Sequence, residues 1–105
     1  MNALITSQHY LDAETVEAKM KAGDFEVQIS PSFEIDGKSY AVILDGTHSY
    51  YAAIKAGVAP ILIEQDKRDN DNVAILDRGD IEGFLEAAHM GEGDYIYADT
   101  RRDVW

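Results

Sequence analysis

The chain of 105 residues contains no cysteine. This absence excludes disulfide bonds, metal sites built from thiolates and a cysteine nucleophile. Long hydrophobic runs are also missing, because no apolar stretch approaches the roughly 18 residues that a membrane-spanning helix needs, and the first residues do not resemble a secretory leader. From the sequence we therefore expect a cytoplasmic protein with no membrane partner.

Basic residues are scarce: 9 Lys and Arg stand against 20 Asp and Glu, which gives a net charge of −11. Proteins that bind a nucleic-acid backbone neutralise its phosphates with several Lys or Arg residues, so direct nucleic-acid binding is not expected. Two interpretations of the charge stay open. It either serves solubility alone or forms an interaction surface for a basic protein partner, in the manner of a DNA-mimicking antagonist. The acids concentrate in residues 64–72, 77–86 and 92–103.

A chain of this length predicts one domain, residues 1–105, with residues 99–105 as a candidate flexible tail. Near the start, residues 3–5 could form an edge strand or a partly ordered arm. Residues 12–22 have apolar positions three and four apart, early acids and late lysines, which predicts a helix. The alternating apolar residues in 25–29 predict a half-buried strand.

The next segment predicts a hairpin. Asp36-Gly37 suits a two-residue type I′ turn and sets Phe33 opposite Tyr40. One face of the hairpin is then apolar, and alternate residues as far as Asp45 make the other face apolar as well. The strand that ends at Asp45 should therefore be central and covered on both sides.

A second helix is expected over residues 47–56, with Ile54 as its larger apolar anchor and Gly57 as its left-handed cap. The run 61–63 predicts an inner strand parallel to the strand before this helix. Residues 64–72 predict a polar loop, 73–76 a short strand, 80–90 a helix ended by Gly91 and Gly93, and 94–98 a last edge strand. The fold class is α/β (α+β): a small mixed sheet in which a hairpin feeds a strand-turn-helix-strand unit, flanked by about three helices.

Function is best argued from the turn between the central strand and the second helix, which has the sequence Asp45-Gly46-Thr47-His48-Ser49. Such a turn directs unpaired backbone N–H groups and the positive end of the helix dipole toward its mouth, where a phosphate can bind. The alternative is a purely structural turn, in which Gly46 permits the bend and Thr47 caps the helix.

The motif resembles the superfamily of ParB N-terminal domains, ParB-like nucleases and sulfiredoxin. In that pattern Gly46 takes the turn glycine, His48 the first basic position, Ala52-Ala53 the small helix pair and Ala56-Gly57 the helix end. The resemblance covers about residues 25–64. Ser49 stands where the family usually has arginine, and the missing cysteine excludes sulfiredoxin chemistry.

The resemblance implies a phosphate or nucleotide triphosphate ligand, held by Gly46, Thr47, His48 and Ser49. Because Ser49 replaces the arginine, we expect weak binding and a regulatory role rather than a fast enzyme. A further alternative is a Mg²⁺-dependent nuclease or phosphotransferase, with His48 and Asp45 as catalytic residues. Arg101 and Arg102 are candidates for supplying the charge that Ser49 lacks.

Overall fold

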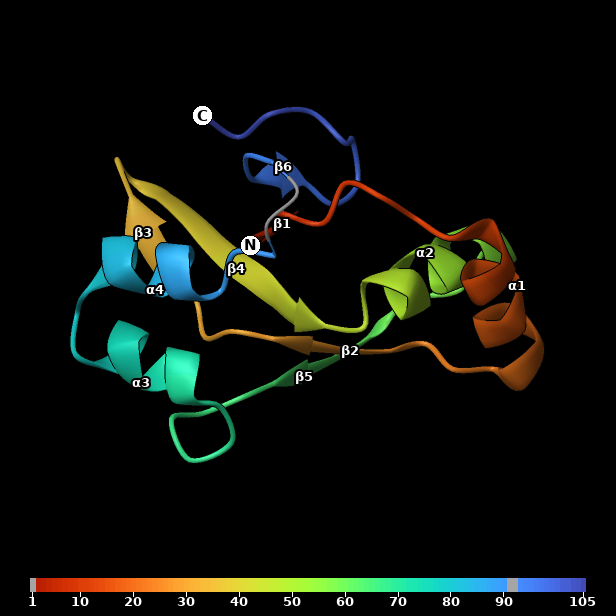
Figure 1. Cartoon of the computed structure of the whole chain (residues 1–105), viewed down its shortest axis with the longest axis horizontal. Helices are drawn as coiled ribbons and strands as arrows, with labels where there is room; N and C mark the ends of the chain where they lie inside the picture. The colour runs from red at the N-terminus through yellow and green to blue at the C-terminus, as the bar shows by residue number, and fades with distance from the viewer. Residues whose placement is uncertain (1, 91–92) are drawn as a thin grey trace.

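The computed structural model describes residues 2–90 and 93–105 and has a mixed α+β fold (Figure 1). The described residues form a six-stranded mixed sheet and four helices. The strands are β1 (Ala3–Thr6), β2 (Glu26–Ile29), β3 (Phe33–Ile35), β4 (Lys38–Asp45), β5 (Ile61–Glu64) and β6 (Ile96–Tyr97). The helices are α1 (Ala13–Ala22), α2 (Thr47–Ala56), α3 (Asp71–Asp77) and α4 (Ile81–Ala87).

The long strand β4 is the centre of the sheet, as the sequence predicts. It pairs in parallel with β1 on one side, and antiparallel with β2 and β3 at successive positions on the other side. The hairpin has the expected register, with Phe33 opposite Tyr40, and both turn residues, Asp36 and Gly37, have positive φ. Val42 and Ile43 are both buried, so the strand is covered on both faces.

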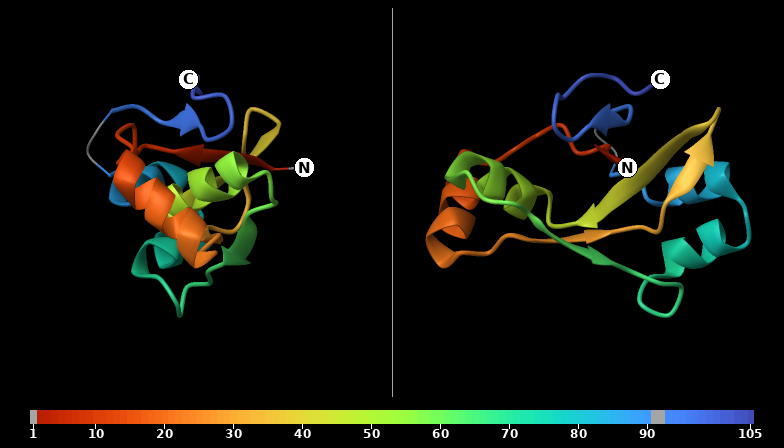
Figure 2. Two further views of the ribbon diagram at one scale, coloured as in Figure 1. Left: turned by 90° about the vertical axis from the view of Figure 1, so that its right-hand side faces the viewer. Right: turned by 180° about the vertical axis from the view of Figure 1, so that it is seen from behind.

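The prediction for β5 is wrong in direction and in place. β5 pairs in parallel with β2, which runs antiparallel to β4, and it forms an edge of the sheet in the order β5-β2-β4-β1-β6. The reason is the position of α2. This helix packs against α1 beyond the end of the sheet and does not cross a sheet face, so β5 starts at the end where β4 stops (Figures 1 and 2).

Ile54 was expected to anchor α2 but is 53% exposed. The helix presents Tyr50, Ala52 and Ala53 to the interior instead, and Tyr50 joins Val27 and Ile43 in one apolar cluster. The small alanines allow close packing, while the aromatic ring supplies most of the buried area. Gly57 caps the helix in the left-handed conformation, as predicted.

The predicted strand at 73–76 is also wrong, because this segment belongs to α3. Its apolar run of four residues fits a helix as well as a strand. The Asn70 side chain accepts hydrogen bonds from the Asn72 and Val73 amides, and this cap starts the helix. α3 and α4 cover a second apolar cluster that includes Phe33, Val42 and Phe84.

α4 begins after Asp80, whose side chain caps the helix by accepting from the Gly83 amide, and it ends at Ala87, before residue 90. Gly91, predicted to end this helix, lies outside the described residues. The last segment, a candidate tail by sequence, folds back onto the sheet: the Val104 amide donates to the Tyr95 carbonyl, and the Trp105 ring packs against Tyr40 and Tyr95.

In the part of the chain that the structure describes, no helix has both the length and the apolar character needed to cross a bilayer.

Candidate functional site

The turn between β4 and α2 depends on Gly46. Its φ is 90°, a conformation that side chains disfavour, and a Cβ atom there would lie 2.7 Å from the Glu26 carbonyl oxygen and 3.1 Å from the Val27 Cα. Glycine therefore serves two purposes here. It provides the left-handed bend, and it lets the turn lie directly against β2.

Gly46 is also the N-cap of α2, and no side chain caps this helix. In the alternative of a purely structural turn, the assignment of Thr47 as the cap is therefore wrong, whereas the bend at Gly46 is as expected. The Gly46 carbonyl accepts from the Tyr50 amide, and the Gly46 amide donates to Asp45 Oδ1 at 2.8 Å. The N–H groups of Thr47, His48 and Ser49 lie in the first turn and have no acceptor within the helix. These groups form the positive end of the helix dipole.

The side chain of Thr47 is the most unusual feature of the turn. The residue is 2% exposed, and its Oγ1 is buried with no hydrogen-bond partner among the described residues. An unpaired buried hydroxyl costs about 1–3 kcal/mol, so native proteins rarely retain one. Thr47 lines a cavity of about 180 Å³ at the mouth of the turn.

Sequence reasoning missed the positive charge at this cavity, which comes from Lys19 of α1. The cavity is lined by residues from four separate parts of the chain: Gln8, Lys19, Asp45, Gly46, Thr47, His48, Ser49 and Met90. Lys19 Nζ lies 2.8 Å from Asp24 Oδ2, and this ion pair raises the pKa of the lysine. The lysine looks in the sequence like one more solvated helix residue, and only the packing of α1 against α2 places it here.

Asp24 is the ion-pair partner of Lys19 and does not itself line the cavity. The hydrogen bond from Lys19 lowers the pKa of its carboxyl group, burial partly opposes that effect, and a hydrogen bond from the Glu26 backbone lowers the pKa further. Ser49, at the position where the resemblance leads us to expect arginine, is buried and brings no positive charge to the cavity that it lines.

His48 lines the cavity, but one of its ring nitrogens is already in use. Its Nε2 accepts a hydrogen bond of 3.1 Å from the backbone N–H of Asp12, the N-cap of α1. A nitrogen that accepts in this way carries no proton while the hydrogen bond is made. While it holds α1 in this way, Nε2 cannot take a proton from a substrate.

Neither candidate arginine lines this cavity. Arg101 donates to the Tyr51 hydroxyl at 2.7 Å and to the carbonyl of His9, and its guanidinium lies over the Tyr51 ring. Tyr51 in turn donates to the Ala98 carbonyl at 2.6 Å, so Arg101 fixes the C-terminal segment to α2. Arg102 lines a different cavity of about 640 Å³.

A metal held by protein side chains alone does not fit this site. No group of three or more His, Asp or Glu side chains that could hold a metal occurs within residues 2–90 and 93–105. Asp45 is exposed, and one of its oxygens accepts from the Gly46 amide. Mg²⁺ typically uses one or two carboxylates together with substrate phosphates and water, so Asp45 fits an ion that arrives with a phosphorylated ligand.

Comparisons of the chain with protein-family models, with curated proteins and with solved structures gave no match. The resemblance to the ParB and sulfiredoxin superfamily therefore stays a prediction.

Proposed function

We propose that the chain is a small ParB-like regulatory domain that binds the phosphate group of a nucleotide or another phosphorylated ligand at the Gly46 turn. The observation that carries this proposal is Thr47 Oγ1, which is buried and has no hydrogen-bond partner among the described residues, in a residue that lines the cavity at the N-terminus of α2. A phosphate oxygen accepts hydrogen bonds from hydroxyl and amide donors, so it would accept from the amides of the first turn and, after a rotation of the Thr47 side chain into the cavity, from Thr47 Oγ1.

The size of the cavity limits what part of a ligand it can enclose. Sites that surround a whole small molecule measure about 300–1,000 Å³, whereas this one measures about 180 Å³. The turn therefore takes the phosphate end of a ligand, and the remainder stays at the surface. This geometry suits a sensor better than an enzyme that must enclose its reaction.

The charges predict weak binding. A helix N-terminus contributes about 0.3–1 kcal/mol to an anion, and a hydrogen bond from a charged donor about 1.5–3 kcal/mol. Lys19 is the charged donor, but Asp24 already pairs with it at 2.8 Å and Asp45 lies at the same cavity. We expect dissociation constants on the order of millimolar for inorganic phosphate, and tighter binding where Mg²⁺ joins a nucleotide to Asp45.

The test is an NMR titration of the amide signals with inorganic phosphate and then with ATP, CTP and GTP, each with and without Mg²⁺. The expected result is a set of shifts centred on Thr47, His48 and Ser49. Lys19→Met should weaken binding about tenfold, the value of one weakened charged hydrogen bond. Lys55→Met is the matched control, because it removes the same charge from an exposed ion pair on α2.

Two results would contradict the proposal. One is the absence of shifts at these three amides at millimolar phosphate and nucleotide. The other is an equal loss of affinity in both lysine variants, because it would show that only the net charge of the protein matters.

A further inference from the structure

The outer edge of the sheet offers a second, independent feature, the backbone of β5. This strand forms one border of the sheet and pairs on its inner side with β2 (Figure 1). The Ile61 and Gln65 amides donate to carbonyl oxygens at the two ends of β2, each at 2.9 Å. Because successive residues of a strand point their backbone groups to opposite sides, the N–H and C=O groups of Leu62 and Glu64 point away from the sheet.

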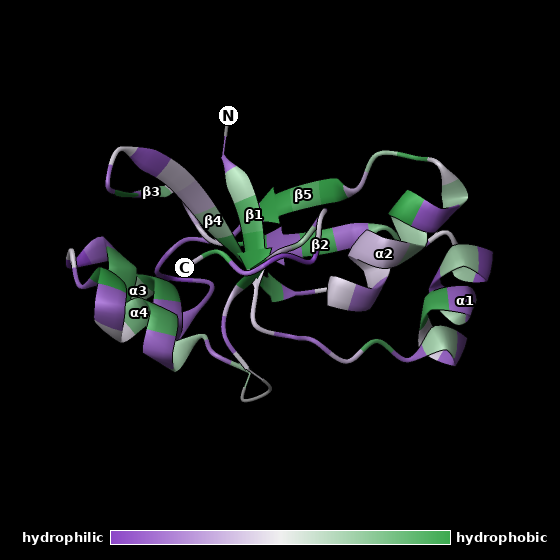
Figure 3. Cartoon of the chain, turned by 90° about the horizontal axis from the view of Figure 1, so that it is seen from above, coloured by the Kyte–Doolittle hydropathy of each residue, from purple (hydrophilic) through white to green (hydrophobic). Residues whose placement is uncertain are grey.

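This open edge is also apolar on both of its faces. Ile61 is 53% exposed and Leu62 is 47% exposed, and the two side chains lie on opposite faces of the strand. The hydropathy colouring in Figure 3 shows β5 as an apolar strand at the border of the sheet. An exposed apolar edge strand is a template for pairing with another chain, and proteins usually block such edges with charge, proline or a covering segment.

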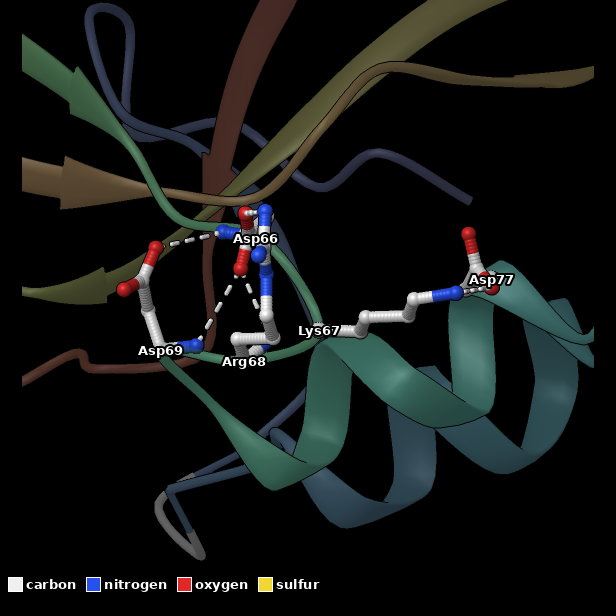
Figure 4. A network of polar contacts seen from close by, with 5 residues as sticks. All are labelled: Asp66, Lys67, Arg68, Asp69 and Asp77. Atoms are coloured by element: carbon white, nitrogen blue, oxygen red, sulfur yellow. Dashed lines mark hydrogen bonds and ion pairs between the residues drawn. The ribbon is translucent and has the colours of Figure 1, made fainter.

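Charge decides what kind of chain fits this edge. β5 continues directly into a segment, residues 64–71, with four acids and two bases. Both bases are already paired: Lys67 Nζ lies 3.4 Å from Asp77, and Arg68 lies 3.5 Å from Asp66 (Figure 4). Hydrogen bonds from the Arg68 backbone and neighbouring groups lower the pKa of Asp66, so its carboxylate stays ionised beside the edge.

A second copy of this chain fits poorly, because each copy carries a net charge of −11 and would bring another acidic segment to the same place. A segment with Lys or Arg residues beside apolar ones meets both features, because its backbone and apolar side chains extend the sheet while its cations lie near the acids. Pro60, just before β5, lacks an N–H group and limits the added strand to the stretch beside Leu62 and Glu64.

We propose that β5 binds an extended, basic segment of a partner protein, which adds to the sheet as a further strand beside Leu62 and Glu64. The hydrogen bonds to the backbone supply part of the affinity, and the acidic segment after β5 selects a basic partner.

The test uses a ten-residue capped peptide of alternating Val and Lys, with amide hydrogen exchange of the protein followed by NMR. The Leu62 and Glu64 amides should exchange about tenfold more slowly with the peptide present. The Ile61 and Ile63 amides already face β2 and should change little. A peptide with Glu in place of Lys should not bind, and one with N-methylated backbone on alternate residues should lose most of its affinity without any change to the protein.

Leu62→Lys should weaken binding of the Lys peptide. Ile54→Lys is the control, because it adds the same charge on α2 at a side chain that is 53% exposed, against 47% for Leu62. This variant should bind the peptide at least half as tightly as the unchanged protein. Three results would overturn the proposal: slowed exchange only at amides outside β5, equal binding of the Lys and Glu peptides, or concentration-dependent dimers in sedimentation that slow the Leu62 and Glu64 amides with no peptide present. The last result would identify a second copy as the occupant.

Discussion

Replacing Thr47 by valine should make the ligand-free protein more stable and at the same time impair phosphate binding. Valine has nearly the shape of threonine, with a methyl group in place of the hydroxyl. The hydroxyl is buried and unpaired, so its removal should recover the cost of an unsatisfied polar group, about 1–3 kcal/mol. Allowing for the slightly larger methyl group, we expect a gain of about 1–2 kcal/mol in the free energy of unfolding.

This gain can be measured by urea and thermal unfolding in phosphate-free buffer, followed by circular dichroism. A gain of 1 kcal/mol in a domain of this size raises the Tm by about 4 °C or more. Added phosphate should stabilise the unchanged protein, because a ligand that binds only the folded state shifts the unfolding equilibrium. The valine variant should gain less from phosphate.

Thr15→Val is a matched control with the opposite expected sign. The Thr15 hydroxyl donates a hydrogen bond of 2.7 Å to Asp12 Oδ2, so the same substitution there should destabilise the protein by about 0.5–1.5 kcal/mol. The reasoning is refuted if Thr47→Val destabilises the protein in phosphate-free buffer by as much as Thr15→Val does, because the Thr47 hydroxyl would then have a partner in the ligand-free state.

Three further predictions concern Gly46 in the turn, the carboxyl group of Asp24 and the buried hydroxyl of Tyr95. Gly46→Ala should destabilise the protein by at least about 2 kcal/mol in urea unfolding, because the alanine would combine a positive φ with a Cβ atom 2.7 Å from a backbone carbonyl oxygen. Gly57→Ala is the control. Its Cβ atom would meet nothing within 4 Å, so it should cost only about 1 kcal/mol. The folded state lowers the pKa of Asp24, so its stabilisation is present above the unfolded pKa of 3.8 and is lost as the pH falls below it; Asp24→Asn should flatten this acid limb of the stability curve. Burial raises the pKa of Tyr95 from 10.0 to about 12, so the free energy of unfolding should fall between pH 10 and 12 as the unfolded state loses this proton first. Tyr95→Phe should remove this alkaline loss of stability. An alkaline limb that is the same in the variant would contradict the prediction.

Local patterns in the sequence were enough for the elements around the site. Asp36-Gly37 determined the hairpin and its register, because the chemistry of a two-residue turn depends only on its own residues. The same holds for the Gly57 cap of α2. The alternation of apolar residues along β4 correctly predicted a strand covered on both faces.

The central place of β4 was predicted correctly, but the predictions for β5, α3 and the buried face of α2 were wrong. A short apolar run is compatible with an inner strand, an edge strand or a helix turn, and the sequence does not say which neighbour covers it. Both β5 and α3 were assigned wrongly for this reason. Ile54 was misjudged because α2 lies beyond the end of the sheet, and its buried face is therefore the one that carries Tyr50.

The sequence by itself determined the glycine turn, the order of most elements and the acidic character of the protein. The tertiary structure alone decided what surrounds the turn. Packing of α1 against α2 brings Lys19 to the cavity, turns His48 toward Asp12 and leaves Thr47 Oγ1 buried without a partner. These contacts join residues far apart in the chain, and their partners depend on how the helices pack, which no local pattern of residues encodes.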